Sequence, residues 1–287
     1  MHAGGDHAKP EDPGALRHDR RDRGELERQR PDQMIELGNK VILVTGSTSG
    51  IGYATAMYFA TLGARVVGTA RQETDLAAEL SDAGARAALL LTADMSREDQ
   101  VAGAIDNILH EFGDLHFAFN NAGIFLRELP LDEHETETWN ELIAANLTSV
   151  YYCMKHEIRA MRSTSTSGVI INNASVVGHR GSAASGIAYT TAKHGVIGMT
   201  RQAAITYAET GIRINAVSPG PTLTPATSPD MALPEPEAKA KISELNPTGE
   251  MAPIETIAAT VAFLCSDLAQ GINGHDVPID GGQLAKL

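Results

Sequence analysis

From Lys40 onward, short apolar runs alternate with longer segments of helical periodicity, and this alternation limits the fold more than any other feature of the chain. Residues 41–44 read Val-Ile-Leu-Val, an unbroken apolar run typical of a strand that is covered on both faces. Residues 51–62 then show helical periodicity and stop at Gly63, a residue type that commonly ends helices. The expected strands are residues 41–44, 65–70, 87–92, 115–120, 169–173, 213–217 and 276–279. The expected helices are residues 51–62, 75–83, 98–112, 136–161, 189–209 and 254–264.

This order of elements predicts an α/β fold. Strands that are joined through helices need right-handed crossovers, which give a parallel sheet with helices on both faces. We therefore expect a doubly wound, Rossmann-like parallel sheet of about seven strands in a single domain. Ligands of such folds bind at the carboxyl ends of the strands, so the residues that follow the strands are the candidates for function.

The first 33 residues differ from the rest, because they are rich in charged residues and contain few large apolar side chains. Such a segment cannot bury enough surface to offset its ordering entropy, so we expect residues 1–33 to be a disordered extension. A basic partner-binding arm is the alternative, although its mixed charges nearly cancel. Residues 34–287 are expected to form the folded domain. Within it, residues 219–250 hold seven of the thirteen prolines and are expected to form a lid with a short helix at 235–245.

Composition excludes several classes of function. A net charge of −13 opposes binding to nucleic acid or to anionic membranes. No apolar run is long enough to span a bilayer, and the first residues lack the apolar stretch that is typical of a signal peptide. The two cysteines, Cys153 and Cys265, lack metal-ligand spacing and are expected to be buried thiols in a cytoplasmic protein. The histidines show no pair at ligand spacing, so no metal site is expected.

A glycine-rich segment follows the first strand and opens the first helix. Gly46 permits a tight turn, Gly50 allows the backbone to approach a pyrophosphate, and Gly52 allows close helix packing. The helix N-terminus offers unpaired N–H groups to an anion. We expect this loop to bind a dinucleotide through Gly46, Ser47, Ser49, Gly50, Ile51 and Gly52. A purely structural glycine turn is the alternative.

Tyr189 and Lys193 lie four residues apart and therefore share one face of the expected helix. A free phenol has a pKa of about 10 and is a poor base near neutrality. A neighbouring ammonium favours the phenolate, so the pair predicts an acid/base group that works nearer to neutral pH. The alternative is an ordinary pair on a helix surface.

Four features occur in an order that resembles the short-chain dehydrogenase/reductase family over residues 38–283. They are the glycine spacing of residues 46–52, the segment Asn120-Asn121-Ala122-Gly123, Ser175, and the Tyr189–Lys193 pair. The resemblance implies a catalytic set of Asn146, Ser175, Tyr189 and Lys193. In it, Ser175 binds the substrate oxygen, Tyr189 exchanges its proton, and Asn146 holds a water that links Lys193 to solvent. Further cofactor contacts implied by the resemblance are Asn121, Ala122, Gly123, Tyr189, Lys193, Pro219, Gly220, Thr222 and Thr224.

The second strand bears on the choice of cofactor. Ala70 stands where NAD-dependent relatives carry an Asp for the ribose 2′-hydroxyl, and Arg71 follows it. A guanidinium there pairs with a 2′-phosphate, which favours NADP(H). Ser49 replaces the basic residue that many NADP-dependent relatives carry, which leaves NAD(H) open. Asp94 resembles the family residue that binds the adenine, with Met95 beside the ring; a helix N-cap is the alternative for Asp94.

The sequence therefore predicts an oxidoreductase that transfers a hydride between NADP(H) or NAD(H) and a secondary alcohol or ketone. A non-catalytic regulator that binds NADP(H) on the same fold is one alternative, and an epimerase or dehydratase is another. The partner is expected to be a small molecule, and the resemblance implies a homotetramer. Pocket residues are suggested by the positions of Val177, Gly178, His179, Met231, Leu233, Leu245 and Met251. No motif identifies the substrate.

Overall fold

The computed structural model describes residues 1, 35, 37–126, 128–164, 166–183, 185–225 and 235–286, and residues 35–287 form one compact unit. The expectation for residues 1–33 falls almost entirely outside the described residues, as does the part of the expected lid at residues 226–234. The remainder of that segment contains a helix, α9 (Glu235–Leu245), at the expected position.

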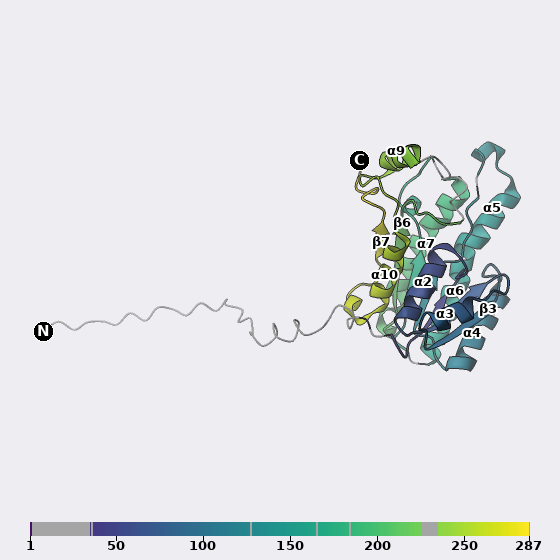
Figure 1. The fold of residues 1–287 in the computed structure, drawn as a ribbon, viewed down its shortest axis with the longest axis vertical. Helices are drawn as coiled ribbons and strands as arrows, with labels where there is room; N and C mark the ends of the chain where they lie inside the picture. The colour runs from purple at the N-terminus through teal and green to yellow at the C-terminus, as the bar shows by residue number, and fades with distance from the viewer. Residues whose placement is uncertain are drawn as a thin grey trace. The chain divides into compact units, whose positions relative to one another are not determined.

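Seven parallel strands form the central sheet, which confirms the expected fold class (Figure 1). Their order in the sheet is β3-β2-β1-β4-β5-β6-β7. The strands are β1 (Val41–Val44), β2 (Arg65–Ala70), β3 (Ala87–Thr92), β4 (Phe117–Asn120), β5 (Val169–Asn173), β6 (Arg213–Pro219) and β7 (Asp276–Ile279). Strands β1 to β3 are added in one direction across the sheet, and β4 then follows on the other side of β1. The carboxyl ends of β1 and β4 therefore border the crevice in which ligands of such sheets bind.

Helices cover both faces of the sheet. Helices α2 (Gly50–Thr61), α3 (Leu76–Asp82) and α10 (Ile254–Cys265) pack on one face, and α4 (Glu98–Phe112), α6 (Ser149–Ser163) and α7 (Ile187–Tyr207) pack on the other. Successive strand residues point to opposite faces, so Ile42 and Val44 join the first core while Val41 and Leu43 join the second. This division explains why β1 is an unbroken apolar run.

The long helix expected at residues 136–161 is interrupted. Helix α5 (Thr136–Ile143) runs into a π-helical turn at Ala144–Thr148 before α6 begins. Within this turn, Asn146 Nδ2 donates to the carbonyl of Leu142 at 3.0 Å. An α-helix would pair that carbonyl with the backbone N–H of Asn146, so the side chain competes with the backbone and the turn widens. The expectation of one regular helix is therefore wrong.

Other boundaries shift by one or a few residues. Helix α7 begins at Ile187 rather than at Tyr189, which places the tyrosine in its first turn. Strand β4 begins at Phe117 rather than at Leu115. Cys153 and Cys265 are both free and buried, as expected. Within the part of the chain that the structure describes, no helix has the length and apolar character needed to cross a membrane.

Candidate active site

The glycine loop lies between the end of β1 and the start of α2. Gly46 and Gly50 have φ angles of +64° and +56°, a backbone region that favours glycine. A Cβ on Gly52 would stand 2.2 Å from the Gly46 carbonyl oxygen, so only glycine lets the helix pack this closely. Ser47 is buried, and its hydroxyl donates to the Thr69 carbonyl at 3.3 Å, which ties the loop to β2.

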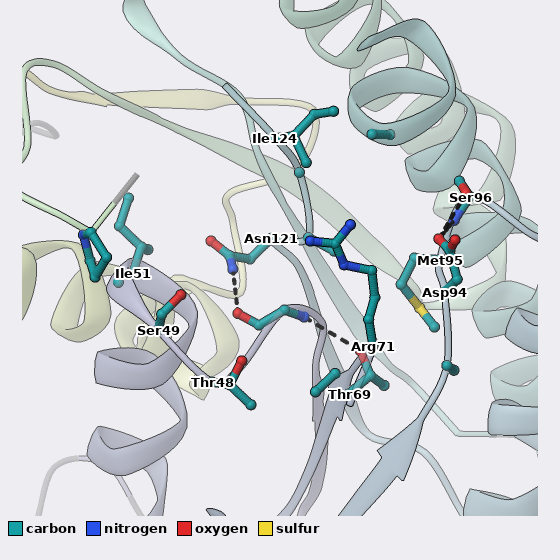
Figure 2. Close-up of a pocket in the computed structure, with 18 of the residues that line it drawn as sticks. Thr48, Ser49, Ile51, Thr69, Arg71, Asp94, Met95, Ser96, Asn121 and Ile124 are labelled. Atoms are coloured by element: carbon teal, nitrogen blue, oxygen red, sulfur yellow. Dashed lines mark hydrogen bonds between the residues drawn. The ribbon is translucent and has the colours of Figure 1, made fainter. Parts of the chain in front are cut away.

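The loop borders a cleft of about 300 Å³ at the carboxyl ends of β1, β2 and β4 (Figure 2). Eleven of the residues expected to bind the cofactor line this cleft: Gly46, Ser49, Gly50, Ile51, Arg71, Asp94, Met95, Asn121, Ala122, Gly123 and Thr224. Ser49 is the N-cap of α2 and makes no side-chain cap hydrogen bond, so the helix end is open to an anion. The residues present therefore fit the pyrophosphate of a dinucleotide.

Arg71 and Asp94 occupy the part of the cleft that lies away from α2. Arg71 directly follows β2, and Figure 2 shows its side chain extending across the cleft. The Asp94 carboxylate accepts hydrogen bonds from the backbone N–H and the hydroxyl of Ser96, at 2.9 and 2.7 Å. Helix α4 has Arg97 as its N-cap, so the alternative assignment of Asp94 as that N-cap is wrong.

A second cavity of about 270 Å³ adjoins the cleft, because Ile51, Asn121, Gly123, Ile124 and Thr224 line both. Its lining includes all four residues of the expected catalytic set, Asn146, Ser175, Tyr189 and Lys193. It also includes the expected contacts Pro219, Gly220 and Thr222. The two cavities thus place the expected catalytic residues next to the expected cofactor site.

Tyr189 and Lys193 project from α7 into this cavity, and Lys193 Nζ lies 5.5 Å from the centre of the Tyr189 ring. Burial raises the pKa of Tyr189 to about 12, while a hydrogen bond with the Ser175 side chain lowers it. Burial also lowers the pKa of Lys193 to about 8. The pKa of the Tyr189 phenol is therefore raised by burial, whereas the sequence predicted that Lys193 would lower it.

Ser175 follows β5 in extended backbone geometry and is the N-cap of a 3-10 turn at Val176–Gly178. Its hydroxyl oxygen accepts a hydrogen bond from the Val177 N–H at 3.3 Å. The turn-forming role and the catalytic assignment are compatible, because the same side chain also hydrogen-bonds to Tyr189. The 3-10 turn holds Ser175 and packs against α7, so it fixes the two side chains relative to each other.

Asn146 is buried beneath the loop that follows β4. Its side chain pairs with the backbone of Ile124 in both directions: Oδ1 accepts from the N–H at 3.1 Å, and Nδ2 donates to the carbonyl at 2.9 Å. A Cβ on Gly123 would stand 2.5 Å from Asn146 Oδ1, so glycine is needed beside this pairing. Asn146 therefore anchors the chain that crosses between the two cavities.

Asn173, the last residue of β5, was not anticipated from the sequence. Its carbonyl accepts from Lys193 Nζ at 2.7 Å, and its Nδ2 donates to Asn121 Oδ1 at 2.9 Å. Asn121 Nδ2 in turn donates to the carbonyls of Thr45 and Gly46, at 3.0 and 3.2 Å. A chain of hydrogen bonds thus links the lysine to the glycine loop. The position of Asn173 at a carboxyl strand end was the available signal.

Phe125 and Gln283 were also missed. The Phe125 ring meets the Tyr189 ring edge-on, with centres 5.2 Å apart. The Gln283 side chain lines the second cavity, and its buried Oε1 has no hydrogen-bond partner in the described structure. Both residues are far from Tyr189 in sequence and carry no motif, so only folding brings them to the site.

Some of the suggested pocket residues lie elsewhere. Val177 and Leu245 line the second cavity, whereas His179 pairs with Asp276 through its Nε2. This pairing ties the segment after Ser175 to β7 and accounts for His179 without substrate contact. Met231 and Leu233 fall outside the described residues.

Comparison with known proteins supports the family resemblance. A family model described as "Enoyl-(Acyl carrier protein) reductase" matches residues 46–283. The chain is 42% identical over 248 residues to cis-4-hydroxycyclohexanecarboxylate dehydrogenase of Sinomonas cyclohexanicum, covering 86% of this chain and 97% of that protein. It is 38% identical over 258 residues to cyclohexanol dehydrogenase of Acinetobacter sp. (strain SE19), covering 88% and 97% of the two chains.

The fold likewise matches solved structures. The crystal structure of levodione reductase superposes with a TM-score of 0.80 at 35% identity, covering 88% of this chain and 100% of that chain. The relatives named above are dehydrogenases and a reductase, and the matched region contains every strand after β1 together with both cavities. The chain therefore belongs to the short-chain dehydrogenase/reductase family of NAD(P)-dependent oxidoreductases.

Proposed function

We propose that this protein interconverts a secondary alcohol and the corresponding ketone, using NADP(H) in preference to NAD(H). One observation carries the proposal: the hydrogen-bonded Ser175–Tyr189 pair and Lys193 line a cavity that adjoins the cleft beside the glycine loop. A bound nicotinamide supplies the hydride chemistry, and the chain supplies binding, orientation and proton transfer.

Tyr189 is the proposed acid/base. With a pKa of about 12, the phenol holds its proton at neutral pH, which suits proton donation to a carbonyl oxygen in the direction of reduction. In the direction of oxidation the phenol must accept a proton, and nearby positive charge favours its deprotonated form. The Lys193 ammonium, 5.5 Å from the ring centre, provides such a charge.

Ser175, which follows β5, and Asn146, in the π-helical turn before α6, are proposed to assist Tyr189 in proton transfer. The Ser175 hydroxyl hydrogen-bonds to Tyr189, so a substrate oxygen placed between them receives a hydrogen bond from each. Asn146 is proposed to hold the water that connects Lys193 with solvent, as the resemblance implies. Its position beneath Ile124, on the lining of the same cavity, supports this assignment.

The cofactor is proposed to bind along the first cleft. The glycine loop and the open end of α2 would hold the pyrophosphate, and Asp94 and Met95 would border the adenine. Arg71 would pair with the 2′-phosphate of NADP(H), because it extends across the cleft from the end of β2. Ala70 offers no carboxylate to a 2′-hydroxyl, which further favours NADP(H) over NAD(H).

The proposed substrate is a compact cyclic secondary alcohol or ketone. Apolar side chains of Phe125, Val177 and Leu245 line the second cavity beside Tyr189, and a carbocyclic ring suits such walls. The names of two relatives, cis-4-hydroxycyclohexanecarboxylate dehydrogenase and cyclohexanol dehydrogenase, support a six-membered ring.

A homotetramer is proposed as the assembly, with α6 and α7 at an interface between subunits. Three large apolar side chains on these helices are exposed: Tyr151 at 49%, Ile187 at 39% and Ile205 at 76%. Burying such side chains between subunits would remove apolar surface from water. Light scattering measures the assembly, and a monomer at micromolar concentration would contradict it.

The activity is tested with a panel of cyclic and open-chain secondary alcohols and ketones, followed by the absorbance of the reduced nicotinamide with each cofactor. We expect turnover with six-membered cyclic substrates, and a higher kcat/KM with NADP(H) than with NAD(H). Turnover that is equal in the wild type and in a Ser175→Ala/Tyr189→Phe double variant would contradict the proposed site.

A further inference from the structure

Glu128 lies in the loop between β4 and α5, and its side chain is completely buried, with 0% exposed. A buried carboxylate is costly unless hydrogen bonds satisfy it. Here Oε2 accepts from the Ala188 N–H at 2.7 Å, and Oε1 accepts from the Tyr189 N–H at 3.1 Å. His134 Nε2 lies 3.0 Å from Oε2 and fixes the carboxylate from its own loop. The carboxylate therefore binds the backbone of Tyr189 itself.

These contacts cap the N-terminus of α7 from a distant part of the chain. Ala188 and Tyr189 are the second and third helical residues, whose N–H groups a local N-cap side chain normally satisfies. The local N-cap is Gly186, which has no side chain. Glu128 takes over that role, and its negative charge also suits the positive end of the helix.

Gly186 provides the space that Glu128 occupies. A Cβ on this residue would stand 2.0 Å from Glu128 Cδ and 2.3 Å from its Oε1. The backbone of Gly186, with φ −85° and ψ 176°, is one that any residue adopts. The glycine is therefore needed for space and not for its conformational freedom. Replacing it with alanine tests the contact with Glu128 without straining the backbone.

The same loop contacts two residues of the proposed catalytic set. Ile124 pairs with Asn146 through two hydrogen bonds, and the Phe125 ring packs edge-on against the Tyr189 ring. Glu128 then reaches the backbone of Tyr189. Ile124, Phe125 and Glu128 thus contact Asn146, the tyrosine ring and the tyrosine backbone in turn.

We propose that Glu128 is a positioning residue. It holds the first turn of α7 in place, and so keeps the Tyr189 phenol in position to bond to Ser175. The inference rests on the function proposed above. Lys193 lies one turn further along and has its own anchor at the Asn173 carbonyl. Loss of the cap therefore displaces the phenol relative to Ser175 while the lysine and the glycine loop keep their places.

The test compares Glu128→Ala, Glu128→Gln, Gly186→Ala and the Glu128→Ala/Gly186→Ala double variant with wild type. Glu133→Ala is the matched control, because Glu133 lies in the same loop and is exposed. A displacement of about 1 Å can cost about 100-fold in rate, so we expect kcat of Glu128→Ala to fall roughly 30- to 100-fold. The dissociation constant for NADPH, measured by fluorescence titration, should change less than about twofold, because the glycine loop is unaffected.

Glu128→Gln should recover part of the rate, since its amide oxygen still accepts a hydrogen bond from the helix while its NH₂ group cannot. Gly186→Ala should lower kcat by displacing Glu128. In the Glu128→Ala background the same change should have a smaller further effect, because the carboxyl atoms that its Cβ would meet are gone and only the Cβ of residue 128 remains. Additive losses in the double variant would overturn the assignment of Gly186 as space for Glu128.

Hydrogen exchange provides a readout that does not depend on turnover. The amides of Ala188 and Tyr189 should exchange faster in Glu128→Ala and remain protected in Glu133→Ala. Faster exchange with an unchanged kcat would make Glu128 a structural cap and overturn its positioning role. Unchanged exchange would overturn the cap itself. Absent turnover in wild type would count against the proposed function alone, since the exchange result stands independently.

Discussion

Lys193 donates a 2.7 Å hydrogen bond from its buried ammonium to the backbone carbonyl of Asn173, the last residue of β5. This bond joins α7 to the strand that leads directly into Ser175. Because Asn173 also binds Asn121, the same residue connects the lysine with the chain that holds the glycine loop. The proposed proton-transfer group and the proposed cofactor site are therefore parts of one hydrogen-bonded framework.

Replacing Tyr189 with Phe removes the hydroxyl and keeps the ring that packs against Phe125. We expect kcat to fall by roughly 100- to 10,000-fold, the usual contribution of general acid–base catalysis. The affinity for NADPH should stay nearly unchanged, because the cleft around the glycine loop is intact. Steady-state kinetics and fluorescence titration measure the two effects. Tyr207→Phe on the same helix is the control, and unchanged turnover in Tyr189→Phe would reject the catalytic assignment.

Replacing Arg71 with Asp changes the charge at the end of β2. A carboxylate repels the 2′-phosphate of NADP(H) and accepts a hydrogen bond from the 2′-hydroxyl of NAD(H). We expect the ratio of kcat/KM for the two cofactors to shift towards NAD(H) by at least about tenfold, the size of one charge-assisted hydrogen bond. Arg86→Asp, an exposed arginine before β3, is the matched control. Equal ratios before and after the change would remove Arg71 from the site.

Replacing Lys193 with Met should stabilise the fold while abolishing turnover. Burial lowers the pKa of Lys193 to about 8, so at lower pH the folded state carries a buried charge at a cost. After subtraction of the lost bond to Asn173, we expect a gain of about 1–2 kcal/mol in the free energy of unfolding near neutrality. The gain should disappear as the pH rises above about 8 towards the ordinary lysine pKa.

Urea unfolding at several pH values measures this effect, with Lys155→Met as control. Lys155 pairs with Glu98 at the surface, where such a change is worth about 0–1 kcal/mol. A Lys193→Met variant that is less stable than wild type at neutral pH would show that the ammonium stabilises the fold.

Replacing Glu157 with Gln should make stability less dependent on pH. Glu157 is fully buried on α6, and burial raises its pKa to about 8 although Asn120 Nδ2 donates to its Oε2 at 3.0 Å. Its stabilising effect is present below the ordinary carboxyl pKa and is lost as the pH rises through about 8. Above that pH the glutamine variant should be more stable than wild type by roughly 2–4 kcal/mol.

At about pH 4 the Glu157→Gln variant and the wild type should unfold at similar urea concentrations, since both carry a neutral side chain there. Glu141→Gln, an exposed position on α5, is the matched control. A parallel fall in the stability of wild type and Glu157→Gln between pH 5 and 8 would show that another group carries the dependence.

The strand pattern was predictable because it reflects local constraints. Residues 41–44 are apolar on both faces of the sheet, and Gly63 ends α2 with a φ angle of +73°, so both features are visible without the fold. The π-helical turn at Asn146 was not predictable. It depends on the side-chain bond to Leu142 and on the pairing with Ile124, which is brought alongside only by packing. Periodicity alone does not distinguish such a turn from a regular helix.

The sequence by itself determined the alternating fold, the glycine loop and the spacing of Tyr189 and Lys193, because each follows from neighbours along the chain. The tertiary structure alone decided what surrounds them: the carbonyl that holds Lys193, the carboxylate of Glu128 on the Tyr189 backbone, and the burial that raises the pKa of the phenol. These depend on residues 20 and 61 positions apart, whose contacts form only when the hydrophobic cores bring separate elements together.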